Sequence, residues 1–209
     1  SRAHYSTLVT EAEAALLRER LVADNAPAAA DRVRALGNGI DCAYFDPDIV
    51  TSELQLRNAG APRLIFTGQM DYLPNVEAAL RVADRVLPLV RKHLPQATFH
   101  IVGRSPVAAL AARHGKDGCH VWGRVDDIRP WLKASDLAII PLDIARGVQN
   151  KVLEAMAMRL PVVLTSAAAR GIDAQDGQDF LVADSDADLA QAVLRIARDD
   201  ALRERLCSH

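Results

Sequence analysis

The residues best suited to chemistry lie in one segment, where an apolar run ends and a helical pattern begins. The run 137–141 is followed by Arg146 and Gly147, and a helix is expected over 148–158 with its start near Gly147. Free amides at a helix start, together with the helix dipole, favour an anion. Arg146 and Lys151 add positive charge at this place. The segment therefore predicts a site for a phosphate-like anion.

Glu154 is the carboxylate of this expected helix, and its role has two alternatives. Lys151 and Glu154 are three positions apart on one helix face, so they could form an ordinary surface pair. Against this, the flanking Leu153, Ala155 and Met156 are apolar. A carboxylate among apolar neighbours requires a hydrogen-bond partner, either a protein group or a ligand hydroxyl.

Further candidates are the residues at which apolar runs end, namely Gly68, Gly103, Gly123 and Pro141. Ligands of open α/β sheets bind outside the carboxyl ends of the strands. Glycine at these ends lets the backbone approach a ligand closely. The alternative is ordinary turn chemistry, which also requires glycine. As a set, these residues predict the sheet edge at which a site would lie.

These candidates must be positioned by an alternation of short apolar runs and stretches of helical period. Strands are expected over 64–68, 98–103, 120–123, 137–141 and 161–165, with a short edge strand at 180–182. Helices are expected over 75–92, 106–114, 126–134, 148–158 and 186–198, the last capped by Ser185 or Asp186. Continuously apolar strands favour a parallel sheet covered on both faces. The predicted fold class is α/β, a doubly wound, Rossmann-like parallel sheet.

The first forty residues show a different pattern. A strand is expected over 6–10, a helix over 11–22, a loop over 26–30, a strand over 32–36 and a Gly/Asn hinge over 37–41. We place a boundary near 37–47, which divides the chain into residues 1–40 and a domain over 41–209. Because the chain begins at Ser1 without Met, we expect it to be part of a longer protein.

Composition excludes several classes of protein. The net charge is −2 and the pI about 6.3, whereas nucleic-acid binding usually requires a basic excess, so no nucleic-acid partner is expected. No apolar run approaches the roughly 18 residues that span a bilayer. The three cysteines and six histidines lack ligand spacing, so no metal is expected, and the unpaired cysteines predict a cytoplasmic location. No G-x-G-x-x-G follows a strand, which argues against a dinucleotide dehydrogenase.

Several motifs, taken in order, resemble a known family. They are Asn38-Gly39-Ile40-Asp41, Thr67-Gly68-Gln69-Met70-Asp71 with Pro74-Asn75, Phe99-His100-Ile101-Val102-Gly103, Trp122-Gly123-Arg124-Val125, and Lys151-Val152-Leu153-Glu154-Ala155-Met156-Ala157. Together they resemble the retaining, two-Rossmann-domain (GT-B) glycosyltransferases of the family four group. The set resembles more closely the sugar transferases associated with bacterial exopolysaccharide and exosortase loci.

The resemblance implies that residues 41–209 form a C-terminal domain that binds a nucleotide-diphosphate sugar. Residues 1–40 would be the end of an N-terminal acceptor domain and the interdomain linker. Glu154 would hold the ribose hydroxyls, and the backbone near Arg124 would form the base-binding edge. The implied substrate-binding residues are Gly68, Gln69, Asn75, Gly103, Arg124, Val125, Arg146, Gly147, Val148, Lys151 and Glu154. Neither a cofactor nor a metal is implied.

Two places depart from the family pattern. Arg146 stands where the first glutamate of the paired-glutamate motif is found. Many relatives also carry Arg and Lys after the first strand, where this chain has Gln69 and Pro74. We therefore expect Arg146 and Lys151 to neutralise the phosphates and to stabilise the leaving group. The catalytic residues as a set stay unassigned.

The expected function is retaining transfer of a sugar from a nucleotide-diphosphate donor to a glycan or lipid-linked acceptor in polysaccharide biosynthesis. The acceptor pocket would lie in the missing N-terminal domain, so this chain alone is expected to be inactive. Membrane contact would be at most peripheral. Two alternatives stay open: a nucleotide-sugar epimerase of the same architecture, and a noncatalytic nucleotide-sugar-binding module.

Overall fold

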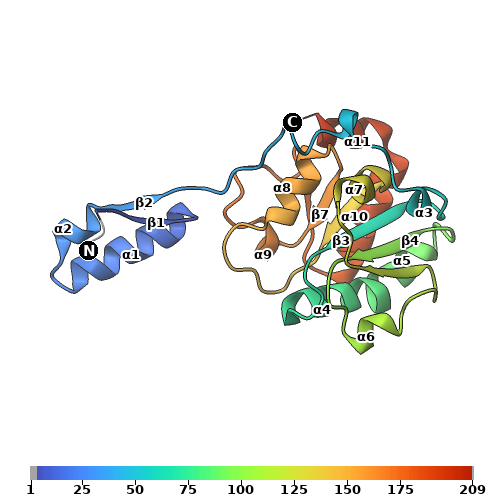
Figure 1. Ribbon diagram of the computed structural model, residues 1–209, viewed down its shortest axis with the longest axis horizontal. Helices are drawn as coiled ribbons and strands as arrows, with labels where there is room; N and C mark the ends of the chain where they lie inside the picture. The colour runs from blue at the N-terminus through green and yellow to red at the C-terminus, as the bar shows by residue number, and fades with distance from the viewer. Residues whose placement is uncertain (1–3, 209) are drawn as a thin grey trace.

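The computed structural model describes residues 4–208, so residues 1–3 of the predicted 1–40 segment and residue 209 lie outside the described residues. The main body contains a six-stranded parallel sheet (Figure 1). Its strands are β3 (Arg63–Thr67), β4 (Thr98–Val102), β5 (Cys119–Gly123), β6 (Leu137–Ile140), β7 (Val162–Leu164) and β8 (Leu181–Val182). Their order across the sheet is β5-β4-β3-β6-β7-β8.

The chain reverses its direction across this sheet between β3 and β6. From β3 it proceeds to β4 and β5 at one edge, and then returns past β3 to β6, β7 and β8. Because parallel crossovers are right-handed, the reversal places the connecting helices of the two halves on opposite faces. The predicted α/β, doubly wound parallel sheet is confirmed. The gap between the ends of β3 and β6 is the switch point at which ligands of this architecture bind.

Helices cover the sheet on both sides. The run after β3 consists of α4 (Leu73–Arg81), η2 (Val82–Val86) and α5 (Leu87–Arg91), and it packs beside α10 (Asp186–Arg198) and α6 (Ala108–Ala111). On β6 and β7 lies α8 (Asn150–Ala157). The other helices of the main body are η1 (Pro47–Ile49), α3 (Leu54–Arg57), α7 (Arg129–Ala134), α9 (Ser166–Ala169) and α11 (Asp200–Cys207).

The long helix expected over 75–92 is one run in three segments. Its middle segment, η2, is a π turn that ends two residues before Pro88. Proline has no N–H to donate, so one regular helical hydrogen bond is lost at this point, and a wider turn accommodates the loss. The hydrophobic period continues through the turn, because Val82, Val86 and Val90 are all buried.

The N-terminal elements form a small unit of their own. A two-stranded parallel sheet pairs β1 (Ser6–Leu8) with β2 (Val33–Ala35), and α1 (Glu11–Ala23) and α2 (Pro27–Ala30) connect these strands. Figure 1 shows this unit beside the main body, joined to it by an extended segment after β2. The loop expected over 26–30 is corrected to the short helix α2, since Pro27 presets a helical φ at its first position. The assignment of residues 1–40 to an acceptor domain stays a prediction.

Local side-chain bonds decide where several helices begin. Ser185 caps α10 by accepting a hydrogen bond from the Asp188 amide at 3.1 Å, as expected. The helix expected over 126–134 begins only at Arg129, because the Asp127 carboxylate accepts the Arg129 amide at 3.0 Å and holds the preceding residues in a turn. The helix expected over 106–114 is reduced to α6. The pattern did not predict α11, which Asp199 caps.

The sheet forms the centre of the core. Every residue of β4, β6 and β7 is buried, which fits the continuously apolar runs from which these strands were expected. The face of α10 that carries Leu189, Val193 and Ile196 is buried against the sheet side of the domain. Because the strands are enclosed on both faces, the polar groups that can meet a ligand gather at the strand ends.

Close contact between two strand ends generates a stability prediction. Gly103 has a φ of +158°, and a Cβ there would lie 1.6 Å from the carbonyl oxygen of Gly68. Gly103→Ala should therefore lower the free energy of unfolding by at least about 2 kcal/mol, because the backbone must move. Urea-induced unfolding followed by circular dichroism measures this change.

Gly115→Ala is the matched control. Gly115 has a φ of +75°, but nothing lies within 4 Å of a Cβ built there. Its substitution should cost only the unfavourable backbone conformation, about 1 kcal/mol. A loss at Gly103 no larger than the loss at Gly115 would contradict the contact.

Candidate donor-binding site

A cleft of about 800 Å³ opens where β3, β4 and β5 end and α8 begins. It is lined by Thr67, Gly68, Gln69, Val102, Gly103, Arg104, Arg124, Val125, Ile128, Val148, Asn150, Lys151 and Glu154. Most of the predicted substrate-binding residues are therefore brought together at one sheet edge. Asn75, Arg146 and Gly147 are the predicted residues that do not line this cleft.

Lys151 crosses from α8 toward the end of β3. Its Nζ donates to Asn75 Oδ1 at 2.6 Å and lies 4.3 Å from the centre of the Phe66 ring. The same nitrogen would be only 3.0 Å from a Cβ at Gly68, so the glycine makes room for it. Burial lowers the pKa of Lys151 to about 8, and the charge of Glu154 opposes this shift. Lys151 is thus a desolvated cation at the switch point.

Asn75 is the hydrogen-bond partner of this lysine, although it does not line the cleft. Its side chain is buried, and both ends of its amide are used. Nδ2 donates to the Gln69 carbonyl oxygen at 3.0 Å, which leaves Oδ1 to accept from Lys151. The structure therefore places Asn75 as a partner of Lys151.

Glu154 lies one turn after Lys151 and faces the same cleft. Burial raises the pKa of its carboxyl group, and the nearby Lys151 charge opposes this. Among residues 4–208, no group donates a hydrogen bond to this carboxylate, and Lys151 turns to Asn75 instead. The alternative of a Lys151–Glu154 surface pair is therefore wrong, and the carboxylate is available to a ligand.

Arg104 is a cleft residue that sequence reasoning missed. Its Nη2 donates to Gln69 Oε1 at 2.6 Å. A signal was present in the sequence, because Arg104 directly follows Gly103 as Arg124 directly follows Gly123. Both arginines therefore lie just after the end of a strand, where the chain lines the cleft.

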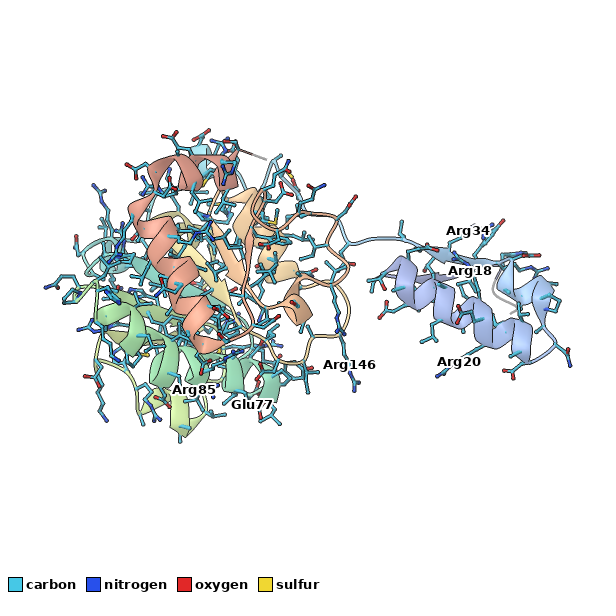
Figure 2. The ribbon with its side chains drawn as sticks, turned by 180° about the vertical axis from the view of Figure 1, so that it is seen from behind. Arg18, Arg20, Arg34, Glu77, Arg85 and Arg146 are labelled. Carbon is cyan, nitrogen blue, oxygen red and sulfur yellow. The ribbon has the colours of Figure 1, made fainter. Side chains whose placement is uncertain are left out.

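Arg146 is separated from Lys151. The helix begins at Asn150 and not near Gly147, because Gly147 has a φ of +64°, outside the right-handed helical region. Arg146 and Gly147 line a different hollow of about 710 Å³ with residues 9–13 and 170–173. Figure 2 shows Arg146 at the side of the main body that faces the N-terminal unit. The expectation that Arg146 and Lys151 share a helix start is corrected.

The histidines near this edge have structural partners. His100 is fully buried in β4, where Nδ1 accepts from Trp122 Nε1 at 3.1 Å and Nε2 lies 2.9 Å from Thr98 Oγ1. Burial, and secondly the charge of His120, lowers the pKa of His100 to about 3, so its ring is neutral. Within residues 4–208, no group of three or more His, Cys, Asp or Glu side chains could hold a metal ion. None of the helices in that part of the chain is long and apolar enough to cross a membrane.

The fold is a doubly wound α/β domain with a cleft at its switch point, and comparison with known families gives the membership of the chain. Residues 61–199 match the family described as Glycosyl transferases group 1, which is more than half of the chain. The chain belongs to this family. No curated protein matches the chain.

Solved structures share the fold at low sequence identity. Anabaena HepE in complex with UDP-glucose has a TM-score of 0.73 and 15% identity, over 99% of this chain and 57% of HepE. The Staphylococcus aureus TarM complex with UDP has a TM-score of 0.72 and 14% identity, over 98% and 39% of the two chains. The C-terminal domain of LpcC from Francisella tularensis has a TM-score of 0.60 and 19% identity, over 81% and 93%. The chain thus spans little more than half the length of HepE and matches GT-B C-terminal domains.

Burial of Lys151 generates a pH-dependent stability prediction. Below about pH 8 the buried Lys151 ammonium lowers the stability of the folded state. Above about pH 8 the folded state releases the Lys151 proton, whereas the unfolded chain keeps it up to its pKa of about 10.5. Lys151→Met should therefore stabilise the protein most at neutral pH. Its advantage over the wild type should fall by about 2 kcal/mol between roughly pH 7 and pH 10. Urea unfolding at both pH values measures it.

Lys92→Met, at an exposed position, provides the background for this comparison. The same fall in both variants would show that the pH dependence has another source than Lys151.

Proposed function

We propose that this chain is most of the donor-binding half of a retaining glycosyltransferase, and that the cleft takes a nucleotide-diphosphate sugar. The observation that carries the proposal is that a desolvated lysine, Lys151, and a carboxylate without a hydrogen-bond donor, Glu154, lie three residues apart at the switch point. A diphosphate supplies the anion that Lys151 lacks. Vicinal ribose hydroxyls supply the donors that Glu154 lacks.

The chemistry follows from where the charge develops. When the bond between the sugar and the diphosphate breaks, its electron pair goes to the phosphate oxygen. The oxygen of an acceptor hydroxyl forms the new bond to the sugar, and the proton of that hydroxyl passes to the departing phosphate oxygen. Lys151 and the free amides at the start of α8 are placed to stabilise the charge on the leaving group. The geometry favours Lys151 over Arg146 in this role, because Arg146 does not line the cleft.

The finer parts of the proposal rest on the motif resemblance. They are retention of configuration, a glycan or lipid-linked acceptor in polysaccharide biosynthesis, a cytoplasmic location and independence of metal. The acceptor would bind in a part of the protein outside this chain, since the chain spans about 57% of HepE. We therefore propose that this chain binds donor without transferring sugar.

UDP is the first probe for calorimetry, because it is the nucleotide in the HepE and TarM structures. We expect the chain to bind UDP, or another member of a nucleoside diphosphate panel, equally with and without EDTA. Lys151→Ala should lose about 1.5–3 kcal/mol of diphosphate affinity, the range of a charge-assisted hydrogen bond, and much less nucleoside affinity. Arg146→Ala is the matched control and should lose less.

Absence of binding to every nucleoside diphosphate would refute the donor site. Equal losses for nucleoside and nucleoside diphosphate would show that Lys151 does not act on the phosphates. The longer protein, incubated with labelled donor, then separates the alternatives, because label moves to an acceptor, appears in an epimerised sugar, or stays in place.

We expect the Glu154 carboxylate to recognise the ribose hydroxyls. The wild type should discriminate against the 2′-deoxynucleoside diphosphate, and Glu154→Gln should lose most of this discrimination with about 1–3 kcal/mol of affinity for the ribonucleotide. The substitution preserves size and removes the charge. Titration calorimetry with the two ligands measures both quantities.

Glu77→Gln is the control, because Glu77 lies on α4 and does not line the cleft (Figure 2). If Glu154→Gln folds, binds the ribonucleotide as tightly as the wild type and retains the ribose preference, the ribose assignment fails.

A further inference from the structure

Two cations beside the end of β3 are held by the oxygens of side-chain amides. Lys151 donates to the amide oxygen of Asn75 at 2.6 Å, and Arg104 donates to the amide oxygen of Gln69 at 2.6 Å. Gln69 lies in the loop between β3 and α4, and Asn75 lies in the first turn of α4. One short stretch of chain, residues 69–75, therefore orients both cations, and it does so through neutral groups.

Four arginines of the main body are held by carboxylates, whereas Lys133 and Arg91 donate to backbone carbonyl oxygens. The pairs are Arg63 with Asp136, Arg81 with Asp143 and Asp186, Arg113 with Asp84, and Arg129 with Asp127. Among residues 4–208, neither Lys151 nor Arg104 forms such an ion pair. Lys151 and Arg104 thus differ from these four arginines, because the oxygen that each contacts belongs to a side-chain amide and carries no charge.

The difference has a physical consequence. A carboxylate partner both orients a cation and cancels its charge, whereas an amide oxygen orients it and leaves the charge available to an anion. For Lys151 the arrangement is costly, because its ammonium is desolvated and Asn75 is itself buried. A carboxylate oxygen in place of the amide oxygen would compensate the charge of the ammonium.

We propose that Asn75 and Gln69 are positioning residues, which hold Lys151 and Arg104 as two uncompensated cations for the diphosphate of the donor. The inference rests on the proposed function and deepens it. The Asn75 amide can bond in one orientation, because Nδ2 is fixed on the Gln69 carbonyl oxygen at 3.0 Å. Arg104 thereby takes the phosphate role that the sequence had suggested for Arg146.

The other charges that face this pair of cations are consistent with such a role. Arg124 lines the same cleft and adds to its positive potential. Glu154 is the cleft's carboxylate, and it lies on α8 without an ion pair to Lys151. The net charge of the cleft residues is therefore positive before a ligand binds.

Asn75→Asp and Gln69→Glu test the proposal, because each replaces the amide by a carboxylate of the same shape. The probe is inorganic pyrophosphate, which carries the diphosphate without a base, and UDP and uridine are measured beside it. We expect Gln69→Glu to unfold at the same or a higher temperature than the wild type. Asn75→Asp also loses the hydrogen bond to the Gln69 carbonyl oxygen, so we expect no gain in its unfolding temperature, and circular dichroism checks that it is folded. Both variants should bind pyrophosphate and UDP about 10-fold or more weakly. Uridine affinity should change less than twofold.

A pH profile distinguishes positioning from a structural role. In the wild type, pyrophosphate affinity should fall as the pH rises above about 8, where Lys151 loses its proton. In Asn75→Asp the new carboxylate should move this fall to higher pH. Asn58→Asp, at an exposed position outside the cleft, carries the same change of charge and should alter neither the affinity nor the profile.

The outcomes separate the two levels of the argument. If the wild type binds UDP and pyrophosphate and Asn75→Asp binds them equally well, the positioning role is overturned while the donor site stands. If Asn75→Asp loses affinity for uridine as much as for pyrophosphate, the residue is structural and the proposal also fails. If the wild type binds neither pyrophosphate nor any nucleoside diphosphate, the proposed function fails and this inference fails with it.

Discussion

The site depends on one costly interaction, the burial of the Lys151 ammonium against Asn75 at the end of β3. Three features of the surrounding chain make it possible. Gly68 has no Cβ that would meet Nζ, the Phe66 ring presents its face, and the Asn75 amide accepts one hydrogen bond. Each offsets part of the desolvation cost without cancelling the charge. Lys151 therefore has no ion-pair partner among residues 4–208, and we propose that an anion in the cleft compensates its charge.

The topology of the sheet determines where this uncompensated charge of Lys151 lies. Because the chain reverses between β3 and β6, the loops after these two neighbouring strands diverge and leave room between them. The loop after β3 supplies Gln69, the first turn of α4 supplies Asn75, and the helix after β6 supplies Lys151. Arg81 of α4 links two neighbouring segments, since it forms ion pairs with Asp143 after β6 and with Asp186 at the start of α10. The proposed nucleotide-sugar cleft lies at this place, and the membership of the chain in the group 1 glycosyl transferases supports that proposal.

Local sequence signals predicted elements well where one residue type controls the backbone. The apolar runs predicted β3 to β8, and Ser185 predicted the start of α10, because burial and capping act over a few neighbours. The start of α8 was predicted at 147–148 and lies at Asn150, since the sequence does not show that Gly147 adopts a φ of +64°. The π turn was also hidden, because its cause, Pro88, lies inside an otherwise regular helical period.

The sequence by itself determined the fold class, and it predicted that Lys151, Glu154 and the strand-end glycines lie at one sheet edge. These follow from periodicity, from glycines at strand ends and from a charged pair among apolar neighbours. Only the tertiary structure decided which groups act together. Asn75 and Lys151 are 76 positions apart, and Gln69 and Arg104 are 35 apart, so their contacts arise from strand order. Arg146 is close to Lys151 in the chain yet points elsewhere, because a short loop can turn a side chain away while a parallel sheet brings distant loops to one edge.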